Sequence, residues 1–188
     1  MKRVSLLYII TLTLFFNSIS AHAQLRTKVV SGLISIDDGA MIPNEKKYTS
    51  LIDSLDKNLK VNPNDTTSLF LRALLYLSFN DLKAKPYQGA KGALENLTTA
   101  KNMAEKALNL KMQNFNLKVL RAQVYKELTY RFTGDESWKY NSKQIADRKH
   151  LFNTYKELAN KYYDELAEAD KSNAYDYQKL KVKANYPL

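Results

Sequence analysis

The chain has 188 residues, a formal net charge of +10 and no cysteine. Its length suits one domain with a single hydrophobic core, and its five glycines and four prolines are few, as an all-helical chain requires. The lack of cysteine excludes disulfide bonds and a lipid-modified cysteine.

The first 23 residues have the pattern of a secretory signal peptide. Lys2 and Arg3 give a positive start, residues 4–16 are apolar apart from Ser and Thr, and Ala21-His22-Ala23 is an A-x-A cleavage site. We expect cleavage after Ala23, which leaves a mature chain of net charge +8 that is not membrane-spanning. Together with the Lys/Asn-rich composition, this favours a Gram-negative bacterium and a periplasmic or secreted location. An uncleaved membrane anchor is the alternative, but the apolar run is short for a spanning helix.

Residues 24–44 predict an extended arm or a short strand packed on the first helix. Val29-Val30 and Leu33 to Ile36 are rich in apolar and β-branched side chains, and Asp37-Asp38-Gly39 indicates a turn. A calcium loop would need further oxygen ligands at alternating positions, and none follow. We therefore interpret the two aspartates as turn residues.

From residue 45 onward, apolar side chains recur at helical spacing, which predicts an all-α domain of about six helices. The expected ranges are 45–61, 66–80, 92–110, 114–132, 142–170, and a last helix from Ser172 or Asn173. The second helix is apolar nearly all round and should be the most buried. The fifth carries a heptad-like seam, made of Phe152, Tyr155, Ala159, Tyr162, Leu166 and Ala169. Residues 179–184 alternate with period two, but the repeat described next favours helix over strand there.

Two segments of the chain repeat at an offset of 49 residues. Leu71, Arg72, Ala73 and Tyr76 in the first match Leu120, Arg121, Ala122 and Tyr125 in the second. A weaker third copy begins 59 positions further on, near Tyr163. Such self-similarity is typical of stacked helical units that cannot bury their apolar faces alone.

These residues resemble a tetratricopeptide repeat, in which a small residue is followed three positions later by an aromatic one. Ala73 with Tyr76 and Ala122 with Tyr125 fit this pattern, as do Pro63 at a turn and small residues on the following helix, namely Ala100, Ala104 and Ala107. The chain departs from the family in having Arg72 and Arg121 where leucine is usual, and in periods above about 34 residues. The resemblance implies that residues 45–188 form stacked antiparallel helical hairpins, a tetratricopeptide-like superhelix. An irregular helical bundle is the alternative.

The sequence offers little for catalysis. His150 is the only histidine left after cleavage, and it lies among basic residues with no His or Cys partner for zinc or nucleophile chemistry. Asp164 and Glu168 share a helix face, but flanking lysines favour an ordinary charged surface. No glycine-rich phosphate loop is present. We therefore expect no catalytic residues, no metal, no cofactor and no enzymatic activity.

The resemblance implies a groove lined by the first helix of each hairpin. At those positions lie Thr67, Phe70, Leu74, Leu77, Asn116, Val119, Gln123 and Lys126. The groove would be apolar at one end and polar at the other, which suits an apolar or amphipathic peptide or helix, including the chain's own arm at 29–36. The resulting hypothesis is a protein–protein interaction module or adaptor of the cell envelope. A small-ligand or glycan-binding protein is the alternative, supported by Trp138 and the 13 tyrosines. Export argues against nucleic acid as the partner of the lysines, and contact with an anionic membrane surface is the better functional interpretation.

Overall fold

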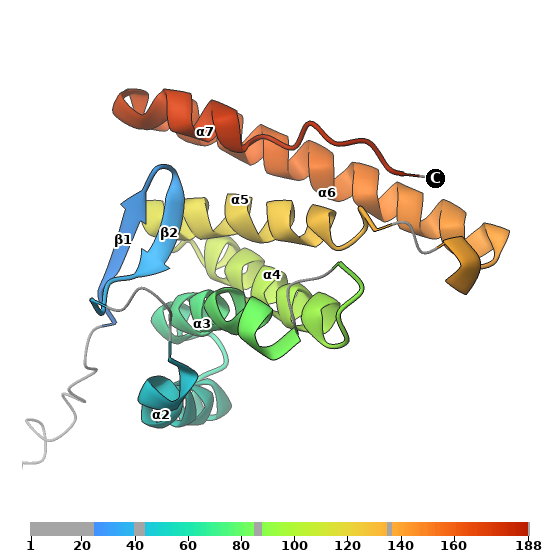
Figure 1. Cartoon of the computed structure of the whole chain (residues 1–188). Coiled ribbons are helices and arrows are strands. Elements are labelled where there is room, and N and C mark those ends of the chain that lie inside the picture. Colours follow the sequence, from blue (N-terminus) through green and yellow to red (C-terminus); the bar gives the residue numbers. More distant parts are fainter. Residues whose placement is uncertain (1–24, 40–43, 85–87, 135–136, 188) are drawn as a thin grey trace, which may run out of the picture.

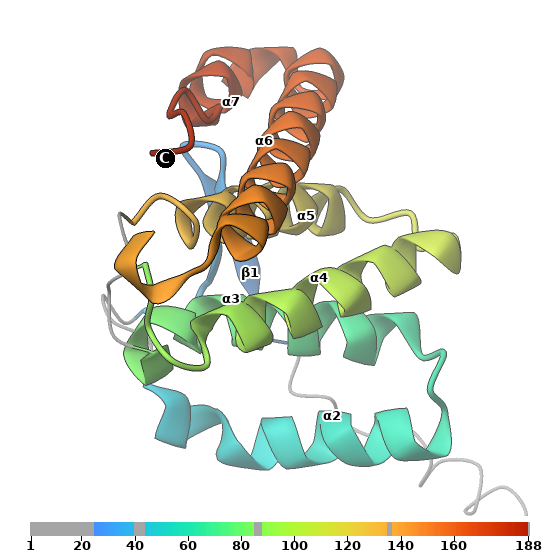
Figure 2. The same ribbon diagram turned by 90° about the vertical axis from the view of Figure 1, so that its right-hand side faces the viewer.

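The computed structural model describes residues 25–39, 44–84, 88–134 and 137–187, so the expected signal peptide lies outside it. These residues are mostly helical, with one small β-hairpin. Six α-helices pack in sequence, each against the next, and form a stack from α2 at one end to α6 and α7 at the other (Figures 1 and 2). They are α2 (Thr49–Val61), α3 (Thr66–Ala84), α4 (Ala93–Asn109), α5 (Phe115–Tyr130), α6 (Ser142–Ala169) and α7 (Ala174–Leu180), with short 3₁₀ turns at Glu45–Tyr48, Ser137–Lys139 and Lys171–Asn173.

Side-chain caps set the starts of three of these helices. The Asp65 carboxylate accepts from the Ser68 backbone N–H at 3.2 Å at the start of α3. The Asn114 side chain accepts from the Asn116 N–H at 2.8 Å at the start of α5. Asn141 and Gln144 form a capping box on α6, each side chain bonding the other's backbone N–H at 2.9 Å. Polar residues in the turns therefore fix where the helices begin, close to the predicted positions.

The core runs along the stack, and α3 and α5 are its most buried helices. On α3, Ala73, Leu74 and Leu75 are fully buried, as the all-round apolar pattern predicts. Small residues let the helices approach closely. The three predicted alanines of α4 are at most 1% exposed: Ala100, Ala104 and Ala107. The predicted seam of α6 packs on α5, although its last member, Ala169, is exposed.

Two equivalent ion pairs explain the unexpected arginines of the repeat. Arg72 on α3 binds Asp56 on α2 with distances of 2.8 and 3.3 Å. Arg121 on α5 binds Glu105 on α4 at 2.7 and 2.8 Å. In both pairs the acid precedes the arginine by 16 residues, and the pairs are related by the same offset of 49. Each arginine therefore joins its helix to the preceding one, where leucine would only pack. A repeat superhelix of tetratricopeptide type stays a prediction.

The arm before α2 is a β-hairpin. Strand β1 (Thr27–Val30) pairs antiparallel with β2 (Leu33–Ile36), with Val30 opposite Leu33. The turn is Ser31-Gly32, with φ values of +48° and +76°. Such left-handed angles are those of the tight hairpin turns that match strand twist. The strand prediction is thus confirmed, but the arm was expected to pack on the first helix, whereas the hairpin lies on α3 and α5 (Figure 1).

The prediction of helix through residues 179–184 is wrong beyond Leu180. At Lys181 the chain turns to an extended conformation (ψ 141°) and then runs back along α6 (Figure 1). The Asn160 side chain accepts from the Val182 N–H at 2.7 Å and donates to the Val182 carbonyl at 3.1 Å. These bonds replace those that a helix would supply. Neither of the two residues expected to cap the last helix makes a side-chain cap.

Candidate binding face

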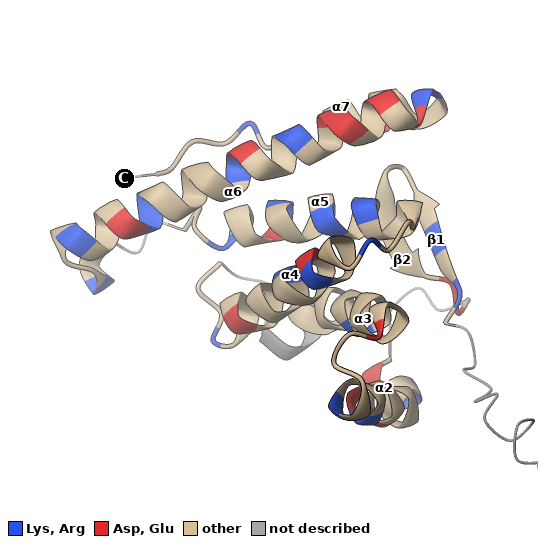
Figure 3. Ribbon diagram, turned by 180° about the vertical axis from the view of Figure 1, so that it is seen from behind, with Lys and Arg blue, Asp and Glu red and all other residues tan. Residues whose placement is uncertain are grey.

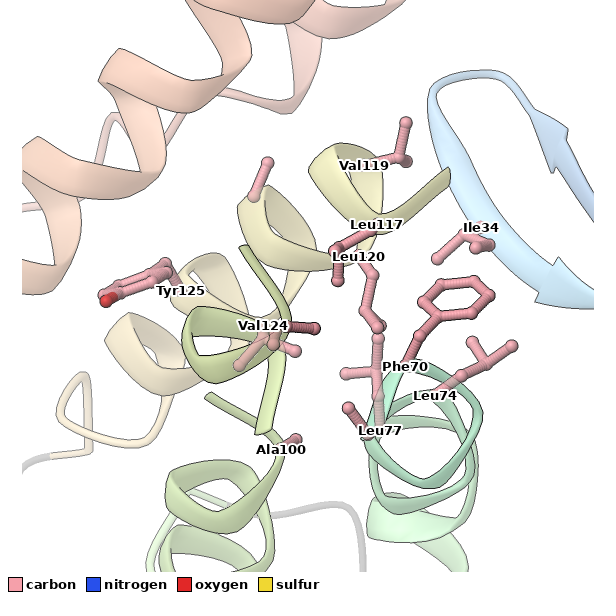
Figure 4. Close-up of a cluster of buried hydrophobic side chains, with 14 of the residues drawn as sticks. Ile34, Phe70, Leu74, Leu77, Ala100, Leu117, Val119, Leu120, Val124 and Tyr125 are labelled. Atoms are coloured by element: carbon pink, nitrogen blue, oxygen red, sulfur yellow. The ribbon is translucent and has the colours of Figure 1, made fainter. Parts of the chain in front are cut away.

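The apolar part of the candidate site is a face of α3 and α5 on which the hairpin lies. Figure 4 shows Ile34 of β2 directed at Phe70 and Leu74 of α3, with Leu117 and Leu120 of α5 beside them. Ile34 is 4% exposed and Phe70 is 5% exposed, so the contact is closed to water. Ile36, two positions along the same strand, is also buried. Alternate residues of β2 therefore fill this face, as the period of a strand dictates.

The polar part of the face binds the main chain of the hairpin. The Gln123 side-chain oxygen accepts from the Ile34 backbone N–H at 3.0 Å. That N–H is available because hydrogen bonding in the hairpin alternates along the strand. A bond from Asp37 N–H to the Arg26 carbonyl (2.8 Å) fits this alternation, which turns the Ile34 N–H away from β1. One α5 side chain thus recognises backbone rather than a particular side chain.

A second α5 side chain binds the other strand. The Asn116 amide nitrogen donates to the Thr27 hydroxyl oxygen at 2.9 Å. Asn116 and Gln123 are seven residues apart, two turns of helix, and therefore lie on the same side of α5. The two amides hold both strands against one side of the helix.

The turn of the hairpin contacts α7, at the far end of the stack. A side chain at Gly32 would place its Cβ 2.8 Å from Leu180 Cδ1 and 3.1 Å from Tyr177 Cδ1, so only glycine fits without displacing them. Tyr177 is fully buried, and this burial, with Asp170 beside it, raises the pKa of its hydroxyl to about 12. The hairpin thus spans from α3 across α5 to α7.

The end of the hairpin nearest α2 is anchored by Asp38. The Tyr48 hydroxyl donates to the Asp38 carboxylate, and Lys47 Nζ lies 3.2 Å from the same oxygen. Burial and the Asp38 carboxylate raise the pKa of Tyr48 above its usual value. Asp38 is therefore held by side chains of the turn that precedes α2. It pairs with Lys47, a single cation, and not with a metal.

The structure brings five of the six principal predicted groove residues against or beside the hairpin. Phe70, Leu74 and Leu77 are buried on α3, and Asn116 and Gln123 are the two amides just described. The sixth, Lys126, follows Gln123 on α5 and is partly buried.

Sequence reasoning missed the hairpin's own contribution. It did not find the turn glycine, Gly32, or its contacts on α7, Tyr177 and Leu180. The Ser31-Gly32 pair between two β-branched runs was a signal for the turn.

The groups considered for catalysis do not assemble into a reactive site. His150 is exposed on α6. Hydrogen bonds from Lys181 (2.8 Å) and then Gln178 (2.7 Å) hold the pKa of Asp164 below its usual value, so this carboxylate is a structural partner of the chain's end. Among the described residues, no three or more His, Asp or Glu side chains gather where they could hold a metal ion.

Charge and length add no further site. Bands of both signs alternate along the helices, α6 in particular (Figure 3). Within the part of the chain that the structure describes, no helix combines the length and apolarity that crossing a bilayer requires.

Comparison with known proteins gives no relative. No family model, no curated protein and no solved structure matches this chain. The face formed by α3, α5 and α7 is therefore interpreted from its own geometry.

Proposed function

We propose that the protein is a non-catalytic protein–protein interaction module of the bacterial cell envelope that binds an extended peptide segment on the face of α3 and α5. One observation carries the proposal: the chain's own hairpin already lies on this face as a bound segment would. Its isoleucines fill an apolar surface, and an α5 amide bonds its main chain. Apolar pockets for alternate side chains with polar groups for the backbone are the usual means of recognising an extended peptide.

The finer fold proposal is a tetratricopeptide-like stack, and three observations support it. The offset of 49 residues relates the ion pair of Arg72 to that of Arg121. The small residues of α4 are buried where the resemblance implies them. The hairpin contacts α3, α5 and α7, the first helix of each proposed unit, which are the helices that line the groove in that family.

The envelope location follows from the expected signal peptide and is part of the same proposal. The predicted mature N-terminus at Gln24 directly precedes the hairpin. Cleavage would leave the hairpin as the first folded element of the exported chain. Net charge after cleavage is positive, which favours an acidic partner protein or contact with an anionic surface.

Photo-crosslinking inside the envelope tests the function. A photoreactive residue at Lys126 reports on the face, and one at Lys57, exposed on α2, is the matched control away from it. We expect one dominant partner protein to be captured from position 126 and not from position 57. Equal capture at both positions, or none from a folded and abundant protein, would contradict the proposal. A fluorescence change at Trp138, which is 75% exposed, on adding envelope polysaccharide would favour the glycan-binding alternative instead.

A further inference from the structure

The hairpin is attached to the helices in a way that lets it leave as a unit. Its outer side faces solvent, with Val30 56% exposed and Leu33 36% exposed. Gly39, just beyond the Asp38 anchor, has φ +77° and open space around its Cβ position. The hairpin can therefore pivot about this point while Asp38 stays bound to Tyr48.

We propose that the hairpin is a displaceable intramolecular ligand, and that the face accepts in its place a strand-forming segment of another protein with branched aliphatic side chains at alternate positions. This inference rests on the proposed function and specifies its partner and its regulation. In the closed state the hairpin covers the face. A partner segment binds only in the fraction of molecules in which the hairpin has undocked.

The chemistry of the partner follows from what the face now holds. Two buried isoleucines at positions i and i+2, Ile34 and Ile36, fill the apolar part. Gln123 bonds a backbone N–H, which any extended segment presents. The contact with Tyr177 and Leu180 admits only a residue without a side chain. The segment that fits is therefore a strand with branched aliphatics at alternate positions, followed or preceded by glycine in a tight turn.

The energetics favour undocking of the hairpin before the helices unfold. A two-stranded sheet is at best marginally stable in water by itself. The helices pack each against the next, so the stack does not need the hairpin to connect them. Regions with few buried contacts and much exposed surface open first.

This arrangement makes a prediction that a purely structural hairpin does not. Substitutions on the helices weaken the intramolecular and the intermolecular ligand alike. A substitution on the hairpin weakens only the intramolecular one, so it raises the open fraction and with it the apparent affinity for a free segment.

The test measures binding of a labelled synthetic peptide of residues 25–38, LRTKVVSGLISIDD, to the chain from Gln24 by fluorescence anisotropy. Ile34→Ala in the protein should bind the unaltered peptide about tenfold or more tighter than the unsubstituted chain does, because the buried side chain holds the hairpin closed. Val30→Ala, on the exposed side of the same hairpin, is the matched control and should change affinity by less than about twofold. Circular dichroism establishes that each variant keeps its helices.

A covalent lock supplies the second arm. The side chains of Thr27 and Asn116 meet at 2.9 Å, and the chain has no cysteine, so Thr27→Cys with Asn116→Cys places one disulfide between hairpin and α5. Oxidation should abolish peptide binding and reduction should restore it. Binding unchanged or weakened by Ile34→Ala, binding that persists in the oxidised lock, or no binding to any folded variant overturns the inference. If the locked protein still captures its partner from position 126 in the envelope, the proposed function stands and only displacement of the hairpin is refuted.

Discussion

The ion pair between Arg121 and Glu105 should stabilise the stack more than an ordinary surface pair. Two parallel bonds of 2.7 and 2.8 Å join the guanidinium to the carboxylate, and each side chain is only 25% exposed. At an effective dielectric constant near 20 the gross attraction is about 4 kcal/mol, and loss of hydration and side-chain freedom offsets much of it. We expect a coupling free energy of about 1–2 kcal/mol, compared with 0.2–1 kcal/mol typical of exposed pairs.

A double-mutant cycle with Arg121→Met and Glu105→Gln, read by urea unfolding at 222 nm, measures this coupling. Arg121→Met alone should cost about 1 kcal/mol more than Glu105→Gln alone, because the guanidinium also lies 3.7 Å over the Tyr162 ring. The matched control is Lys161 with Glu165, a pair 3.9 Å apart whose side chains are 66% and 57% exposed. If the Arg121–Glu105 coupling is no larger than that of the control, the pair does not join α4 to α5 as argued here.

Three further predictions concern the hairpin, a helix start and the chain's end. Gly32→Ala should lower the free energy of unfolding more than Gly39→Ala does, because both positions have positive φ but only at Gly32 does a new Cβ meet neighbouring side chains; equal losses in urea unfolding would contradict this. Asn141→Ala should cost about 1 kcal/mol in the same assay by removing the capping box of α6, and a loss below about 0.3 kcal/mol would mean that the cap is not formed. The pKa of Asp164 is lowered in the folded chain by its bond from Lys181, so this carboxylate adds stability above its unfolded pKa and loses that contribution as the pH falls through its folded pKa. Asp164→Asn should therefore destabilise the protein at pH 7 and cease to do so near about pH 2, and an effect independent of pH would refute the role of the charge.

The helices could be predicted because their signals are local. Apolar periodicity and capping side chains such as Asn114 and Asn141 act within one or two turns, so the sequence alone places most helix boundaries within a few residues. The end of the last helix depends instead on Asn160, which lies more than 20 residues earlier and binds the backbone of Val182. A contact between segments so far apart leaves no periodic trace in the sequence.

The candidate face was predictable from one side only. The repeat pattern placed Phe70 and Gln123 on the lining helices, because helical spacing fixes which residues share a side. What covers the face depended on the register and turn of the hairpin. The period of two in a strand decides whether Ile34 or Leu33 points inward, and a turn displaced by one residue would exchange them. The Ser31-Gly32 turn is therefore the feature that most determines what the face binds.

The departures of the repeat from its family pattern are informative for the same reason. Arg72 and Arg121 looked like mismatches when each was compared with leucine alone. Each becomes intelligible once the acid 16 residues earlier is considered with it. The third unit carries the same acid at Asp164, but its cation, Lys181, comes 17 residues later, just beyond the end of α7. The pairing is thus retained where the helix is not, which indicates that joining successive helices through an acid–base pair is a property of the unit, and that the short third unit completes the stack with an extended tail instead of a further helix.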